Sequence, residues 1–584
     1  MTEYKHRLIQ IGIVGLIAIL NSCSTSQKNK SFTPDKFSEY IGRYALKTDL
    51  ILEVKKESDL LTLRPSFWRS SQILDSIGED KFSSLLHPQM QFEFVRDNKG
   101  KIVSLLSTGH KEINGTAKRL DPNEHKVVEL LLLGNTREAI TKLKSPSEEI
   151  SEERLVNLGF NLIQKFPSKA NDALTLVSAF ESEYSNSIDL QHVIALGSLL
   201  IDNRANAITA FKKAAIIDSN NSLTKSSLRL LDPANATPAP ENSWELPFDM
   251  DELFKKPSPE EIENVLADWQ ARDLGVKRIK IVDEQNIDLN QSHYTVQIIS
   301  HEIHGNKHYG AVLIPKGAKL GSSPVVLELH GVDPQYSPFK ITDAETPFIL
   351  GENQAKVIIA IPSFRGNTFM IEDRSYVSEG SPTNAYDRAA DDAIAFLNVV
   401  LERVPEVDPT RISAFGKSRG GTVALLVGVR DKRISSVIDW AGPAEWFSHM
   451  GTFGWTLKEQ VQWALWERWA PGNGWGSASQ YIDHFLVQSI EFGESSLKKV
   501  RHKILASSPL YFLDSLPVAQ LQYGTEDGAV PISNAEALQH ALKLRDKSAP
   551  SFEIYMHKNT GHDMPYPVAY DLSREFLIKQ FSNK

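Results

Sequence analysis

The C-terminal half of the chain contains short apolar runs separated by polar stretches, the pattern of a sheet buried on both faces. These runs occupy residues 324–329, 357–361, 412–415, 434–439, 518–522 and 552–556. Residues 294–301 and 309–314 precede them and indicate an opening hairpin. Residues 385–404 carry apolar side chains at helical spacing, which predicts a helix that faces the core. Together the runs predict an α/β domain with a mostly parallel sheet.

Residues 32–120 show a different pattern, which predicts an all-β domain. Residues 50–54 and 61–63 are short apolar runs, and Phe92 and Phe94 alternate with polar residues. This region resembles the small lipocalin-like β-domains that are appended to secreted bacterial hydrolases. We therefore expect a structural or binding module, because no catalytic constellation is visible in it.

Residues 121–231 change to a helical period and contain a repeat. The residue pairs that begin at Ala139, Ala173 and Ala207 recur at intervals of 34 residues, which is the tetratricopeptide period. Three such helical hairpins would share a buried seam and offer one concave face, for which we expect a protein partner. An unrelated helical bundle with the same spacing is the alternative.

Prolines and small residues in residues 232–244 indicate a linker, because such residues cannot build a core. The α/β domain is therefore expected over residues 245–584, and the motifs described below predict that it is the catalytic domain. Residues 441–507 fall between two predicted strands. An insertion at this place is expected to form a helical cap over the candidate catalytic residues described below.

Tryptophan is concentrated in this predicted cap. Seven of the ten tryptophans of the chain lie between Trp440 and Trp475. Large aromatic side chains beside a site can line an apolar substrate pocket, and on this interpretation Trp455 and Trp466 bind substrate. The alternative is that these side chains form the core of the cap itself.

The pentapeptide Gly416-Lys417-Ser418-Arg419-Gly420 follows a predicted strand and precedes a helical run of small residues. A G-x-S-x-G pattern between a strand and a helix is typical of a nucleophile elbow, and glycine permits the tight turn. The N-terminus of the following helix favours developing negative charge. Ser418 is therefore the candidate nucleophile. A phosphate-binding loop would need glycine at position 411, which is arginine, so the nucleotide interpretation fails.

Two later polar segments supply the remaining members of a triad, in the chain order nucleophile, acid, histidine. Asp527 and His562 each come shortly after a predicted strand, where open α/β sheets place their sites. His562 would accept the proton of Ser418, and Asp527 would orient the imidazole. Glu526 and His557 are the local alternatives.

These motifs resemble the catalytic domain of prolyl oligopeptidase-type serine hydrolases within the α/β-hydrolase superfamily. The resemblance extends over about residues 290–584. It rests on residues 407–412 leading into the elbow, on Ser508-Pro509-Leu510 with residues 524–531, and on Gly561-His562.

The resemblance implies a peptidase that cleaves short peptides through an acyl-enzyme, and we expect no cofactor. It also implies an oxyanion hole, for which we expect the backbone N–H groups of Arg419 and Val332. A carboxylesterase or acyl esterase of the same fold is the first alternative. The second is a non-catalytic, repeat-bearing interaction lipoprotein.

Charge and histidine spacing argue against two kinds of ligand, nucleic acid and metal ions. The formal net charge is −9 and the sequence shows no basic stripe, which argues against nucleic-acid binding. His301 and His304 lie three residues apart on a predicted strand and so on opposite faces, hence we expect no metal site there.

The sole cysteine of the chain is Cys23, so no intrachain disulfide can form. Residues 1–22 combine a short basic segment with an apolar run that is too short to span a membrane, as in a secretory signal. Leu20-Asn21-Ser22-Cys23 resembles a bacterial lipobox, which implies a lipidated Cys23 at the start of a polar tether over residues 23–31. We therefore expect a lipid-anchored protein of the bacterial cell envelope that faces the periplasm. An uncleaved anchor with an unmodified Cys23 is the alternative.

Overall fold

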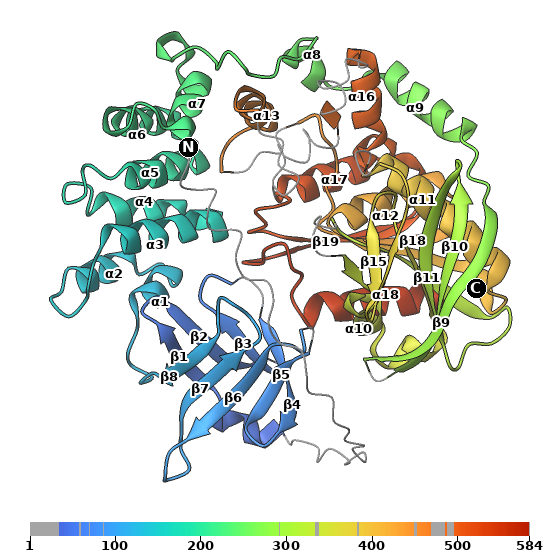
Figure 1. The fold of residues 1–584 in the computed structure, drawn as a ribbon, viewed down its shortest axis with the longest axis horizontal. Coiled ribbons are helices and arrows are strands. Elements are labelled where there is room, and N and C mark those ends of the chain that lie inside the picture. The colour runs from blue at the N-terminus through green and yellow to red at the C-terminus, as the bar shows by residue number, and fades with distance from the viewer. Residues whose placement is uncertain are drawn as a thin grey trace.

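The computed structural model shows three units, a β-barrel in blue, a helical domain in teal and an α/β domain in green to red (Figure 1). It describes residues 34–57, 60–68, 71–85, 87–290, 292–332, 338–381, 385–448, 453–468, 485–486 and 496–582. The predicted signal and tether, with Cys23, lie outside the described residues, as does much of the predicted cap. No helix in the described part of the chain is long and apolar enough to cross a bilayer.

The N-terminal unit is a closed antiparallel barrel, which confirms the all-β prediction. Its strands are β1 (Gly42–Lys47), β2 (Leu50–Glu57), β3 (Leu60–Pro65), β4 (Gln72–Gly78), β5 (Lys81–Ser84), β6 (Gln91–Arg96), β7 (Ile102–Thr108) and β8 (Gly115–Arg119). Alternation along β6 buries Phe92 and Phe94 against Tyr44 and the other core side chains. The pairing of β1 with β8, in which Tyr44 lies opposite Arg119, closes the barrel.

The second unit is helical, and its helices pack in sequence, each against the next or the next but one. They are α1 (Val127–Leu132), α2 (Thr136–Leu143), α3 (Glu152–Lys165), α4 (Ala170–Ser178), α5 (Ile188–Leu200), α6 (Arg204–Ile217) and α7 (Ser222–Leu231). Ala139, Ala173 and Ala207 are fully buried, so the repeating small residues lie where the helices meet. The tetratricopeptide type and its protein partner stay predictions.

The third unit is built on one mixed sheet with the strand order β20-β19-β18-β17-β12-β14-β11-β10-β9. The strands are β9 (Lys277–Leu289), β10 (Ser292–Ile303), β11 (Asn306–Pro315), β12 (Ser323–Leu329), β14 (Ile358–Pro362), β17 (Val407–Lys417), β18 (Ile434–Trp440), β19 (Val518–Gly524) and β20 (Phe552–His557). Strands β20 to β14 run parallel, whereas β11, β10 and β9 continue antiparallel. A small second sheet contains β13 (Phe339–Lys340), β15 (Thr368–Ile371) and β16 (Arg374–Val377).

Helices cover both faces of the large sheet. They are α10 (Thr346–Leu350), α11 (Asp387–Arg403), α12 (Arg419–Arg430), α17 (Ser533–Lys543) and α18 (Val568–Ser582), with α8 (Met250–Phe254), α9 (Pro259–Ala271), α13 (Leu457–Trp466) and α16 (Leu497–Ala506) further out. The last two residues of β18 face opposite sides of the sheet. Asp439 points at α12, whereas Trp440 donates a hydrogen bond to Ser573 of α18. Successive strand residues face opposite ways, so α12 and α18 lie on opposite faces.

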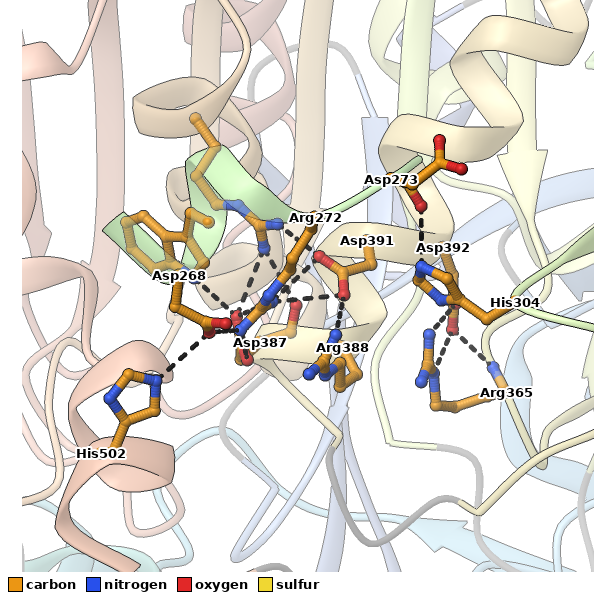
Figure 2. A network of polar contacts seen from close by, with 12 residues as sticks. Asp268, Arg272, Asp273, His304, Arg365, Asp387, Arg388, Asp391, Asp392 and His502 are labelled. Atoms are coloured by element: carbon orange, nitrogen blue, oxygen red, sulfur yellow. Dashed lines mark hydrogen bonds and ion pairs between the residues drawn. The ribbon is translucent and has the colours of Figure 1, made fainter. Parts of the chain in front are cut away.

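A buried ion-pair network fixes the helices on one face (Figure 2). Arg272, just after α9, lies 2.8 Å from Asp387 and 3.1 Å from Asp391, both in the first turns of α11. Arg430 at the end of α12 pairs with the same two carboxylates. Removal of one partner from such a network leaves a buried charge uncompensated, so the network holds α9, α11 and α12 in one arrangement.

The helical domain packs directly on the α/β domain. Arg204 of α6 forms a bidentate ion pair with Glu459 of α13, at 2.8 and 3.1 Å. Gly454 lies so close to α5 that a Cβ atom there would be 2.3 Å from the Leu199 carbonyl carbon. The Phe160 and Phe453 rings also lie 6.3 Å apart. Residues 453–459 of the predicted cap are therefore held against the helical domain.

Candidate active site

Ser418 occupies a strained turn between β17 and α12. Its backbone angles are φ 58° and ψ −126°, a conformation that L-residues rarely adopt and that costs roughly 1–3 kcal/mol. The Ser418 N–H donates to the Trp440 carbonyl at 2.8 Å, and the Ser418 carbonyl accepts from the Gly421 N–H at 2.9 Å. These contacts hold the turn in place, so the strain is carried at the predicted nucleophile.

The flanking glycines are required by close backbone approach. A Cβ atom on Gly416 would lie 2.0 Å from the Gly420 carbonyl oxygen. A Cβ atom on Gly420 would lie 1.8 Å from the carbonyl oxygen of Leu329, the last residue of β12. The elbow is thus pressed onto the neighbouring strand, which explains the G-x-S-x-G pattern in this chain.

Asp527 and His562 meet at the same end of the sheet, after β19 and β20. Asp527 Oδ2 lies 2.8 Å from His562 Nδ1. Asp527 Oδ1 accepts the N–H groups of Ala529 and Val530 at 2.8 and 2.9 Å, so the acid is fixed by its own loop. The Nδ1–H of the imidazole therefore points to the acid, and Nε2 is left for the nucleophile.

Among the described residues, no hydrogen bond joins Ser418 Oγ to His562. Nucleophile–base contacts are often long in the absence of substrate, and shorten in the complex. The alternative acid and base are engaged elsewhere. Glu526 accepts the Ser168 N–H of the helical domain at 3.2 Å, and His557 Nε2 contacts Gln522 Oε1 at 2.8 Å.

The predicted oxyanion donors belong to segments beside Ser418. A Cβ atom on Gly331 would lie 3.8 Å from Ser418 Cβ, so the loop after β12 runs alongside the nucleophile, and Val332 is the next residue. Arg419 is the first residue of α12, where backbone N–H groups have no partner within the helix. The assignment of both N–H groups to an oxyanion hole stays a prediction.

An ion pair that the sequence analysis missed links the nucleophile and histidine loops. Lys417 precedes Ser418, Asp563 follows His562, and their charged groups lie 2.6 Å apart. Lys417 holds the pKa of Asp563 below its usual value, and His562 and then His87 of the barrel lower it further. Burial opposes the charge of Lys417, but Asp563 and Glu345 outweigh it and raise its pKa. The signal was present in the sequence, because both residues are direct neighbours of predicted triad members.

The two tryptophans predicted to bind substrate contact the helical domain. Trp455 packs against the helical core, and the Trp466 ring lies 5.8 Å from the Arg229 guanidinium carbon of α7. Among the described residues, no hydrogen bond or ring contact joins either tryptophan to a triad residue. Their role in substrate binding stays a prediction, and the contacts favour a role in domain packing.

A metal cluster or a cavity outside the triad could also mark a functional site. The described residues contain no group of three or more His, Cys, Asp or Glu side chains placed to hold a metal ion. A cavity of about 540 Å³ lies between the barrel and α3. Asp49 and Arg154 line it and pair with each other at 2.7 Å, so it is separate from the triad.

Asp439 supports the elbow from below. A Cβ atom on Gly421 would lie 2.0 Å from Asp439 Oδ1, which also accepts the Gly442 N–H at 2.9 Å. The Tyr523 hydroxyl lies 2.5 Å from Asp439 Oδ2 and 2.7 Å from the Gly442 carbonyl oxygen. Burial raises the pKa of Asp439 to about 7. A protonated Asp439 can donate to the Tyr523 oxygen while Tyr523 donates to Gly442, so every group has a partner.

We expect the stability of Asp439→Asn relative to wild type to be greater at pH 8 than at pH 5. The raised pKa of Asp439 means that the folded state binds the proton more tightly, so stability from this group falls as pH rises towards about 7 and is lost above it. Asparagine keeps a donor and an acceptor without charge. The apparent melting temperature of the variant minus that of wild type should rise by roughly 2–4 °C or more between these pH values. The matched control is Asp571→Asn, at an exposed pair on α18; a difference independent of pH for Asp439→Asn would contradict the expectation.

No protein-family model matches the chain. An acetyl xylan esterase from Paenibacillus sp. R4 is similar over 57% of this chain and 96% of that one, with 18% identity and a TM-score of 0.37. An acylaminoacyl peptidase from Pyrococcus horikoshii is similar over 50% of this chain and 42% of that one, with 14% identity and a TM-score of 0.35. An acetyl xylan esterase from Thermoanaerobacterium sp. JW/SL YS485 has 15% identity, a TM-score of 0.38, and coverage of 57% and 99%. These similarities include esterases and a peptidase and are too distant to indicate an activity.

Proposed function

We propose that this protein is a serine hydrolase that works through an acyl-enzyme. The observation that carries the proposal is the placement of Ser418 on a positive-φ elbow, at the sheet end where Asp527 and His562 form a pair at 2.8 Å. A strained non-glycine residue that its surroundings hold in place is a mark of functional sites, because packing alone gives no reason to keep the strain.

Each residue has a defined role in the proposed reaction. Ser418 Oγ attacks the carbonyl carbon of the substrate while His562 Nε2 accepts its proton. Asp527 stabilises the imidazolium through Nδ1, and backbone N–H groups beside the elbow stabilise the negative carbonyl oxygen. His562 then protonates the leaving group. Water, deprotonated by the same histidine, hydrolyses the acyl-enzyme and frees Ser418.

Within this class we propose a prolyl oligopeptidase-like peptidase that acts on short peptides. The motifs around residues 407–421 and 508–531 support it, since they resemble that branch. One observation favours the alternative, a carboxylesterase or acyl esterase. The upstream residues described between 42 and 231 form a barrel and a helical domain, whereas propellers supply the size filter in prolyl oligopeptidase-type peptidases.

Ser418→Ala should reduce kcat/KM on an activated ester by about 10⁴-fold or more and abolish labelling by a fluorophosphonate probe, which reacts only with an activated serine. His562→Ala should be comparably severe. Asp527→Ala should be roughly ten- to a hundred-fold less severe, because the base remains.

His557→Ala and Glu526→Gln are the matched controls, since each changes a neighbour of the same type that is bonded elsewhere. Both should keep most of the activity. Undiminished turnover in Ser418→Ala, or a loss in His557→Ala as large as in His562→Ala, would overturn the assignment.

A substrate panel separates peptidase from esterase. Amide cleavage requires His562 to protonate a poor leaving group, whereas an activated phenol leaves unaided, so nitrophenyl esters do not discriminate. We expect measurable kcat/KM on short peptide amides, including proline-containing ones, beside acetylated sugars and short-chain alkyl esters. Ester cleavage with no amide turnover at high enzyme concentration would contradict the peptidase proposal and favour the esterase alternative.

The proposed location is the bacterial cell envelope, through a lipid on Cys23. Several acyl chains on one residue would hold the protein firmly to a bilayer. Mass spectrometry of the native protein should therefore find Cys23 as a lipidated N-terminal residue, and Cys23→Ser should abolish the lipid mass. An unmodified Cys23 in the mature native protein would refute this proposal.

A further inference from the structure

The side chain of Arg419 is buried although the residue directly follows the nucleophile. The residue is 3% exposed. Its Nη2 atom lies 2.6 Å from the Gly331 carbonyl oxygen and 2.8 Å from Asn367 Oδ1. The guanidinium carbon also lies 5.0 Å from the Phe364 ring centroid. Arg419 therefore reaches back from α12 to the loop that follows β12.

The hydrogen bonds of the Arg419 guanidinium are directed at two oxygen atoms, those of the Gly331 carbonyl and the Asn367 side chain. Nη2 carries two hydrogens, and the two short contacts to Gly331 and Asn367 account for both. His330 stacks between Phe339 and Phe364 and lies 3.1 Å from Nη2 through Nδ1. Burial, and then the charge of Arg419, hold the pKa of His330 well below its usual value. A neutral imidazole does not repel the guanidinium, so His330 and Arg419 can lie in contact without a cost from like charges.

The contact with Gly331 bears on the next peptide N–H. The Gly331–Val332 peptide bond is trans, and in a trans peptide the C=O and N–H groups point in opposite directions. A donor fixed on the Gly331 oxygen therefore sets the direction of the Val332 N–H. A charged donor on the carbonyl also polarises the amide and makes the N–H on its other side a stronger donor.

We infer that the Arg419 side chain is a positioning group for the oxyanion hole, which orients and polarises the Gly331–Val332 peptide beside Ser418. On this inference one residue serves both halves of the hole. The backbone N–H of Arg419 is one donor, and its guanidinium aligns the other. The inference rests on the proposed serine-hydrolase function, because an oxyanion forms only in such a reaction.

The test compares the full chain with Arg419→Lys, which keeps the positive charge but loses the planar fork. Active sites are counted by endpoint labelling with a fluorophosphonate, so that misfolded protein does not enter the rates. The readout is kcat on an ester divided by kcat on the thionoester of the same acid and alcohol. Sulfur is a poor hydrogen-bond acceptor, so this ratio reports N–H donation to the reacting atom and is insensitive to general loss of stability.

Arg419→Lys should lower kcat on the ester by about ten- to a thousand-fold. The thionoester rate should fall much less, so the ratio should drop at least tenfold while KM changes little. The matched control is Arg430→Lys, at a buried arginine on the other end of the same helix that pairs with Asp391. It should leave the ratio at the wild-type value even where it lowers the melting temperature.

An unchanged ratio in labelled, folded Arg419→Lys would overturn the inference. Where that variant does not fold, Asn367→Ala decides, since it removes one acceptor of the guanidinium and leaves the arginine in place. A reduced ratio supports the inference and an unchanged ratio refutes it. Failure of the wild-type protein to react with the probe at all would instead refute the proposed function.

Discussion

The close backbone packing at Ser418 is the constraint on which the rest of the catalytic domain depends. The turn leaves no space for a Cβ atom at Gly416 or Gly420, since either would collide with a carbonyl oxygen within about 2 Å. One of those oxygens belongs to Leu329 of β12, while the Ser418 N–H is held by Trp440 of β18. The elbow is thus fixed by both strands that neighbour β17. Movement of either strand would release the strain and move the nucleophile.

Two buried carboxyl groups, those of Asp439 and Glu328, support this turn, and each has hydrogen-bond partners close by. Asp439 sits beneath the start of α12 with Tyr523 and the Gly442 N–H as partners. Glu328, one residue before the end of β12, accepts the N–H groups of Glu345 and Thr346 at the start of α10. Burial raises the pKa of Glu328 to about 7, like that of Asp439. Two carboxyl groups that favour the neutral form therefore lie under the strand ends that carry the site, which couples its architecture to pH.

The sequence predicted the parts of the site that depend on local pattern. The runs at residues 412–415 and 518–522 fall inside β17 and β19, because central strands are continuously apolar. β9 was not predicted, since it is an edge strand with mostly exposed polar residues and so lacks an apolar period.

The contacts of Trp455 and Trp466 with the helical domain were also beyond the sequence. They depend on how two domains pack, and periodicity within one domain carries no information about that. The link from Ser168 of the helical domain to Glu526, beside the catalytic acid, is of the same kind.

The two variable positions of the elbow motif have complementary tasks. Lys417 and Arg419 stand on either side of Ser418, and the charged group of each contacts a different loop. Lys417 is tied to Asp563 in the histidine loop at 2.6 Å, and Arg419 to Gly331 in the loop after β12 at 2.6 Å. Each charged hydrogen bond connects the elbow to one other part of the site, on separate strand ends. Because a misplacement of about 1 Å can cost about a hundred-fold in rate, these side-chain contacts add to the backbone packing that holds the three parts of the site in register.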